Sequence, residues 1–267
     1  MALTLAPDEL VARVRRDAER SLLRLRNGLK HIAGVDHPEF GQTPKDTVWE
    51  AEKVRLWRYR SDRRTIRTPV LFVHSLVTRS YVFDLVPGNS VIESMIDRGF
   101  DVYLIDWGVP DELEAANTLE TYTDGYLPEI VTEVAAAAGS TDISMFGYCF
   151  GGLLSLLCVA GNRSLPIRNL AVQATPIDFA QMGPMTSMMQ QGRMDPDDVI
   201  DFTGNVPAAV MRNSFRTLKP TGDVTAYVNL WEHLWNDEFV AAHQAMTGWA
   251  GDHVPFPGAA FRQTNEL

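Results

Sequence analysis

Residues 143–152 read Ile-Ser-Met-Phe-Gly-Tyr-Cys-Phe-Gly-Gly, and this stretch decides the fold. The first four residues form a short apolar run of the kind found in buried strands, and an apolar segment of helical length continues to Gly161. A strand, a sharp turn that carries a nucleophile, and a helix form, in that order, a nucleophile elbow. Gly147 and Gly151 flank the turn, where neighbouring backbones approach too closely for a Cβ atom. The stretch therefore predicts an elbow with Cys149 at its tip.

Cys149 has a chemical use at such a turn. Its thiol would lie at the amino end of the following helix, where the positive end of the helix dipole favours a thiolate. The backbone amide of Phe150 can then donate a hydrogen bond to a developing oxyanion. The alternative is that the glycines pack a helix and Cys149 is an ordinary buried thiol, but the strand before the turn and the helix after it favour the elbow. Cys158 lies nine residues further along among leucines and is predicted to be a core residue.

Short apolar runs on both sides of this stretch predict the rest of a sheet. The runs are Val54–Tyr59, Val70–Val73, Val102–Ile105 and Leu170–Ala174, and the first, which contains arginines, is predicted to be an edge strand. Between them, Ser90 can cap a helix that Gly99 ends. A capping box from Thr121 to Asp124 can open another helix, which Gly139 ends. Strands and helices in alternation predict right-handed crossovers and a mostly parallel sheet with helices on both faces.

The chain divides into three predicted segments. Residues 1–35 form an N-terminal helical segment, expected to pack through an apolar stripe from Leu10 to Leu29. Residues 36–176 form the α/β core with the elbow. Residues 177–267 form a helical cap region, which opens with a segment rich in methionine and later carries Trp231 and Trp235 at helical spacing. We therefore expect a cap inserted into the sheet domain, with the final strands of the sheet missing.

The loop that follows Val70–Val73 is the second element of the predicted site. It reads His-Ser-Leu-Val-Thr-Arg-Ser-Tyr from residue 74 to residue 81. Either Leu76 or Val77 can supply the second amide of an oxyanion hole, and we favour Val77. His74, in this loop, and Asp106, after the next strand, are expected to order loops and not to react.

A cysteine nucleophile needs a histidine base and an acid that orients it, which follow the nucleophile in this kind of fold with the histidine last. The histidines after the elbow are His233, His243 and His253, and none follows a strand-like run and a loop. Asp252 and His253 are adjacent, so they cannot form the required contact in an ordinary geometry. We therefore expect the aspartate and the histidine of the triad to be absent from these residues, and the chain as given to be inactive.

Composition excludes several classes of function. With 34 acidic and 24 basic residues the formal charge is −10, which does not favour nucleic-acid binding. Two cysteines do not make a disulfide scaffold and indicate reduced thiols in a cytoplasmic protein. The most apolar run, Leu153–Ala160, is too short to span a bilayer, and residues 1–20 have no signal-peptide core. We predict no membrane span, no metal and no resident cofactor.

Several separated motifs occur in the order of one known family. They are His37–Glu39, Thr43–Asp46, Asp101–Pro110, the box Gly147–Gly152, Asn229–Trp231 and Asn236–Phe239. Together they resemble the polyhydroxyalkanoate synthases, in particular the class III catalytic subunit, which belongs to the α/β-hydrolase superfamily. Thr78 stands where this family commonly has asparagine. The run from Asp252 to Pro255 is similar to the acid motif of the family, but it lies too early in the chain, and we interpret it as a lookalike.

This resemblance implies a reaction and partners. The reaction is polymerisation of (R)-3-hydroxyacyl groups from coenzyme A thioesters through a thioester on Cys149, with coenzyme A released and no cofactor required. The implied partners are 3-hydroxyacyl-coenzyme A, a second copy or a second synthase subunit, and the surface of a polyester granule in the cytoplasm. Two alternatives remain: a cysteine-box hydrolase that resembles dienelactone hydrolase, and a catalytically silent fragment that binds a partner subunit or the granule.

Overall fold

The computed structural model describes residues 7–33, 39–178, 191–192, 195–218 and 220–266. A six-stranded sheet is its central element, with strand order β1-β2-β6-β3-β7-β8. The strands in that order are β1 (Lys45–Ala51), β2 (Val54–Tyr59), β6 (Val102–Asp106), β3 (Val70–Val73), β7 (Ile143–Tyr148) and β8 (Ile167–Gln173). β1 and β2 run antiparallel to their neighbours, and β6, β3, β7 and β8 are parallel. The predicted mostly parallel sheet is confirmed.

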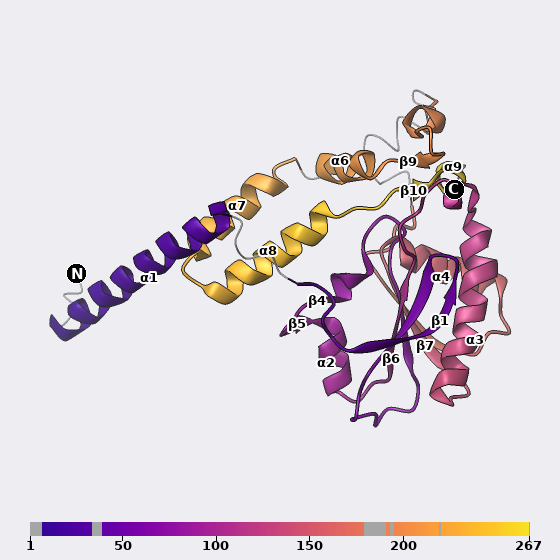
Figure 1. The fold of residues 1–267 in the computed structure, drawn as a ribbon, viewed down its shortest axis with the longest axis horizontal. Helices are drawn as coiled ribbons and strands as arrows, with labels where there is room; N and C mark the ends of the chain where they lie inside the picture. The colour runs from indigo at the N-terminus through magenta and orange to yellow at the C-terminus, as the bar shows by residue number, and fades with distance from the viewer. Residues whose placement is uncertain (1–6, 34–38, 179–190, 193–194, 219, 267) are drawn as a thin grey trace.

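Helices cover both faces of the sheet, as Figure 1 shows. α2 (Val91–Asp97) lies on one face, and α3 (Leu127–Ala138) and α4 (Phe150–Gly161) lie on the other. Alternating side chains of β3 belong to two separate cores: Leu71 and Val73 pack with α3 and α4, and Val70 and Phe72 pack with Ile92 of α2. This alternation follows from the period of two in a strand, so a continuous apolar run serves both faces.

Two local predictions are wrong. β2 is not an edge strand, because β1 pairs with it along its outer side from Lys45 to Ala51. The capping box lies three residues earlier than predicted: the Thr118 amide donates to Thr121 Oγ1 at 3.1 Å, and the Thr121 amide donates to Thr118 Oγ1 at 3.4 Å. The helix therefore begins earlier, with a π-helical turn from Thr121 to Tyr126 ahead of α3. The other predicted ends hold, since Ser90 accepts from the Glu93 amide and Gly139 ends α3 with φ 63°.

β8 forms the second edge of the sheet. In the part of the chain that the structure describes, no further strand pairs with it, and most of its residues are exposed. The chain instead continues into α6 (Ala208–Leu218), α7 (Gly222–His233), α8 (Asp237–Gly251) and α9 (Gly258–Glu266), with the short strands β9 (Asn205–Val206) and β10 (Phe256–Pro257) paired beside α9. Most of the methionine-rich segment predicted at the start of the cap lies outside the described residues.

The C-terminal part of α1 (Pro7–Ala33) contacts the connection between α7 and α8, and the helix extends away from the sheet (Figure 1). The contact includes polar groups: buried Asn27 donates to the Leu234 carbonyl at 2.8 Å, and Arg26 Nη2 donates to both carboxylate oxygens of Asp237 at 2.5 and 2.6 Å. The predicted packing of the apolar stripe of α1 is wrong for this chain. Its members Val14, Leu22, Leu25 and Leu29 are each at least 60% exposed, because α1 docks through its other face.

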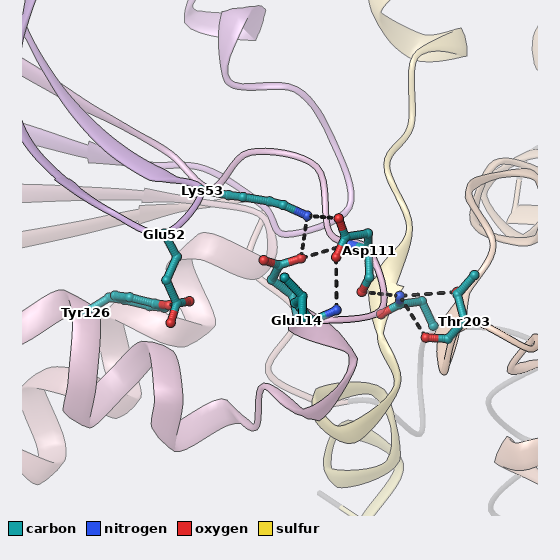
Figure 2. Close-up of polar contacts among 8 residues, drawn as sticks. Glu52, Lys53, Asp111, Glu114, Tyr126 and Thr203 are labelled. Atoms are coloured by element: carbon teal, nitrogen blue, oxygen red, sulfur yellow. Dashed lines mark hydrogen bonds and ion pairs between the residues drawn. The ribbon is translucent and has the colours of Figure 1, made fainter.

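A polar network joins the segment around β9 to the sheet, as Figure 2 shows. Lys53, in the turn between β1 and β2, pairs with Asp111 at 2.5 Å and with buried Glu114 at 2.7 Å. Buried Asn205 of β9 donates to the Asp111 carbonyl at 2.8 Å. Because the network joins residues that are more than 90 positions apart in sequence, it holds the segment around β9 against the loop that follows β6.

Candidate active site

Cys149 lies at the turn between β7 and α4. Its backbone has φ 54° and ψ −128°, a left-handed conformation that is costly for a residue with a side chain and is typical of strained functional turns. The turn is held from both sides: the Cys149 amide donates to the Gln173 carbonyl of β8 at 2.9 Å, and the Cys149 carbonyl accepts from the Gly152 amide at 2.9 Å. This is the geometry of an elbow.

The flanking glycines are required by close backbone contacts. A Cβ atom on Gly147 would lie 2.5 Å from Gly152 Cα, and one on Gly151 would overlap the carbonyl oxygens of Val73 and His74. The start of α4 is therefore pressed against the end of β3. This contact holds the loop after β3 beside the elbow.

Burial controls the state of the Cys149 thiol. It raises the pKa of Cys149, and hydrogen bonds from the Phe150 amide and the Ser75 hydroxyl oppose this increase without cancelling it. Burial therefore outweighs the effect of the helix end on the pKa of Cys149, although the Phe150 amide at that end does favour the thiolate. Because the thiol is the favoured form, a reaction at Cys149 needs a group that accepts its proton.

Ser75 contacts both elements of the predicted site, the elbow that carries Cys149 and the loop that carries Val77. It is fully buried, its hydroxyl is hydrogen-bonded to Cys149, and its Oγ accepts from the Val77 amide at 3.4 Å. Val77 is buried as well, and its carbonyl accepts from the Val254 amide at 3.2 Å. The loop that carries Val77 is thus tied both to the nucleophile and to the segment after α8.

We expect Ser75→Ala to raise the pKa of Cys149 further, because a hydrogen bond that favours the thiolate is lost. The measurement is the rate of alkylation by iodoacetamide as a function of pH, with the modified residue identified by mass spectrometry. The midpoint should move to higher pH, and alkylation at pH 7 should slow severalfold. Ser155→Ala is the matched control, since Ser155 is also fully buried but bonds the Gly151 carbonyl. An equal effect in both variants would contradict the assignment.

The end of α8 and the residues that follow it hold the loop after β3 in place. Asp252 accepts from the Tyr81 hydroxyl at 2.7 Å and lies 3.4 Å from Arg79 Nε, and Trp249 Nε1 donates to the Arg79 carbonyl at 3.0 Å. His253 forms a β-bridge with Thr78. The Asp252 carboxylate is thus used to hold this loop.

A cavity of about 410 Å³ opens beside Cys149. It is lined by Thr78, Tyr148, Cys149, Arg212, Phe215, Arg216, Pro220, Gly222, Thr247, Trp249, Ala250, Gly251 and His253. Residues of the α/β core and residues of α6 and α8 therefore line the same cavity. Sequence reasoning gave no role to Arg212 or Arg216, although two arginines one helical turn apart are a signal that it could have used.

Of the three histidines after the elbow, His253 is the one found among the described lining residues of this cavity. Its ring centroid is 5.2 Å from that of Phe215, and burial together with the Arg212 charge lowers its pKa. His233 lies at the end of α7 with its ring 4.6 Å from that of Phe239. The sequence analysis expected no base here, so the shared cavity of Cys149 and His253 is a result that only the structure provides.

The Asp106 side chain helps to order the loop after β6, and His74 lies buried in the loop after β3. His74 is buried, and burial lowers its pKa to about 4, so its ring is neutral at pH 7. Its carbonyl accepts from Trp107 Nε1 at 3.0 Å, and Asp106 accepts from the Gly108 amide at 3.3 Å. The residues that the structure describes contain no group of three or more side chains that could hold a metal ion, and none of the described helices has an apolar stretch that could span a bilayer.

Comparisons with known proteins agree with this fold. Residues 68–250 match the family described as alpha/beta hydrolase fold. The chain is 34% identical over 232 residues to the poly(3-hydroxyalkanoate) polymerase subunit PhaC of Haloferax mediterranei, covering 86% of this chain and 47% of that protein. It is 33% identical to the subunits of the same name from Thiocystis violacea and Allochromatium vinosum, covering 90% of this chain and 68% of each of them.

The chain thus spans about half the length of the Haloferax protein and about two thirds of the other two. The family model covers most of the chain and assigns the fold. The relatives above 30% identity assign the family within that fold. The chain therefore belongs to the α/β-hydrolase fold and, within it, to the family of poly(3-hydroxyalkanoate) polymerase subunits PhaC.

Proposed function

We propose that this chain provides the nucleophile of an acyltransferase that polymerises (R)-3-hydroxyacyl groups from coenzyme A thioesters through a thioester on Cys149. One observation carries the proposal: Cys149 lies at a strained turn between strand and helix and opens into a cavity. The names of the relatives support the reaction class. A thiol suits this chemistry because it exchanges one thioester for another of similar energy, so the acyl group is not trapped.

The proposed reaction has two steps. In the first, the Cys149 sulfur attacks the thioester carbonyl and gives its proton to a base, and the bond to the coenzyme A sulfur breaks as that thiolate takes up a proton. In the second, the 3-hydroxyl of another unit attacks the Cys149 thioester, forms an ester and restores the thiol. The amides of Phe150 and Val77 are the proposed oxyanion donors, and the contact of Phe150 with the thiol supports this role.

The proposed partners are those that the resemblance to the synthase family implies. They are a second copy or a second synthase subunit, and the surface of a polyester granule in the cytoplasm. Apolar side chains of α1 and α7 are exposed in this chain, which supports the proposal that another molecule covers this surface. Leu22 of α1 is 69% exposed, and Trp231 of α7 is 72% exposed.

Substrate preference tests the proposed function. We expect the full-length protein to release coenzyme A from 3-hydroxybutyryl-coenzyme A and to leave dienelactone unchanged. The measurements are thiol release with a colorimetric reagent and the absorbance of the lactone. The opposite preference would place the protein with the cysteine-box hydrolases. If neither substrate reacted and no acyl group were found on Cys149, the proposal would be replaced by the catalytically silent alternative.

A further inference from the structure

The cavity beside Cys149 carries positive charge in an acidic protein. Arg212 and Arg216 of α6 both line it, and they lie four residues apart, so they share one face of the helix. Among the described lining residues there is no aspartate and no glutamate. In a chain with a formal charge of −10, two arginines as the charged residues in the described lining make this cavity locally positive, which favours an anion over a cation.

Arg212 is positioned to bind a ligand in this cavity. It is half-buried, and its Nε is buried without a hydrogen-bond partner among the described residues. A buried donor on a charged group is costly when it is unpaired, and an anion that enters the cavity would remove that cost. The guanidinium fork matches the oxygen atoms of a phosphate, which it can bind with two parallel hydrogen bonds.

The cavity combines this charge with apolar and reactive groups. Cys149 and Tyr148 come from the elbow, and Phe215 and Trp249 contribute aromatic surface. Arg216 is more exposed than Arg212, so positive charge continues from the interior of the cavity toward solvent. A ligand with an uncharged reactive end and phosphates at its other end fits this order of groups.

We propose that Arg212 and Arg216 bind the phosphate groups of the thioester carrier from which Cys149 takes its acyl group. This proposal rests on the proposed function, because it assigns the distant, unreactive part of the same substrate. Binding energy from such a part can align the reacting carbonyl with the sulfur. The two arginines are positioning residues in this role, and they take no part in bond making.

A pair of thioesters with and without phosphate tests the proposal. The substrates are 3-hydroxybutyryl-coenzyme A and 3-hydroxybutyryl-N-acetylcysteamine, and acylation of Cys149 is followed by mass spectrometry at substrate concentrations below saturation. The quantity to compare is the ratio of the two rate constants. In Arg212→Met and in Arg216→Met we expect this ratio to fall about tenfold to hundredfold, the effect of losing charged hydrogen bonds. Arg15→Met should keep the ratio, since Arg15 is exposed on α1 and pairs with Glu19.

A binding measurement gives a readout that does not depend on acyl transfer. Calorimetry with coenzyme A should show weaker binding to Arg212→Met than to the unchanged protein, and pantetheine, which lacks phosphate, should show no such difference. High salt should weaken coenzyme A binding more in the unchanged protein than in the double variant, because phosphate contacts are screened.

The outcomes separate this inference from the proposed function. An unchanged ratio, or an equal loss with both thioesters, would overturn the phosphate assignment, because the arginines would then support the cavity alone. If coenzyme A bound through Arg212 and Arg216 but neither thioester acylated Cys149, the phosphate site would stand and the proposed function would fail.

Discussion

Replacing Cys149 with alanine in the full-length protein is expected to abolish coenzyme A release and acyl transfer, with a loss of roughly a thousandfold or more, as for other enzymes that lose their nucleophile. Cys158→Ala should keep most of the activity. Cys158 is fully buried in α4, and burial raises its pKa to about 12, so it is a thiol at neutral pH. The measurements are coenzyme A release from 3-hydroxybutyryl-coenzyme A and the mass of the acylated protein.

The comparison of the two cysteine variants is decisive because each removes one sulfur atom, one from the turn before α4 and one from the last turn of α4. Circular dichroism and thermal unfolding of each variant show whether the fold is kept. Similar activity in folded Cys149→Ala and Cys158→Ala would remove Cys149 from the role of nucleophile and would end the proposed mechanism.

Gly151→Ala is expected to destabilise the fold by about 3 kcal/mol, the upper part of the usual range for overpacking. The new Cβ atom would meet the carbonyl oxygens of Val73 and His74, which belong to backbone that cannot rotate away. Either α4 or the loop after β3 must shift, so the position of Cys149 relative to Val77 changes as well. We expect the melting temperature to fall by roughly 5–10 °C and alkylation of Cys149 to change its pH dependence.

Gly251→Ala is the matched control for this change. A Cβ atom on Gly251 would meet nothing within 4 Å, and Gly251 is the last residue of α8. Alanine there should leave stability unchanged or raise it by about 0.5–1 kcal/mol, because glycine has the higher entropic cost in a helix. If both variants melted at the temperature of the unchanged protein, the close contact between α4 and β3 would be wrong.

Features that depend on near neighbours in the chain could be predicted from the sequence. The apolar runs at β2 and β3 were predicted with the bounds that the structure has, and the caps at Ser90 and Gly139 are where they were expected. The elbow also belongs to this class, because the glycines around Cys149 are within a few residues of the turn that needs them. β1 was missed, since a seven-residue strand with mixed polar and apolar side chains has no clear apolar run.

Features that depend on distant residues required the tertiary structure. The helix dipole at Cys149 is local and favours the thiolate, but burial by the rest of the fold is the larger effect and raises the pKa. The hydrogen bond between Tyr81 and Asp252 joins residues that are 171 positions apart in the sequence. Arg212, which follows the sheet strands in the chain, lines the same cavity as Cys149. No local pattern specifies such pairs, because the way the segment that carries Arg212 packs on the core is decided by many weak contacts summed over the whole surface that it covers.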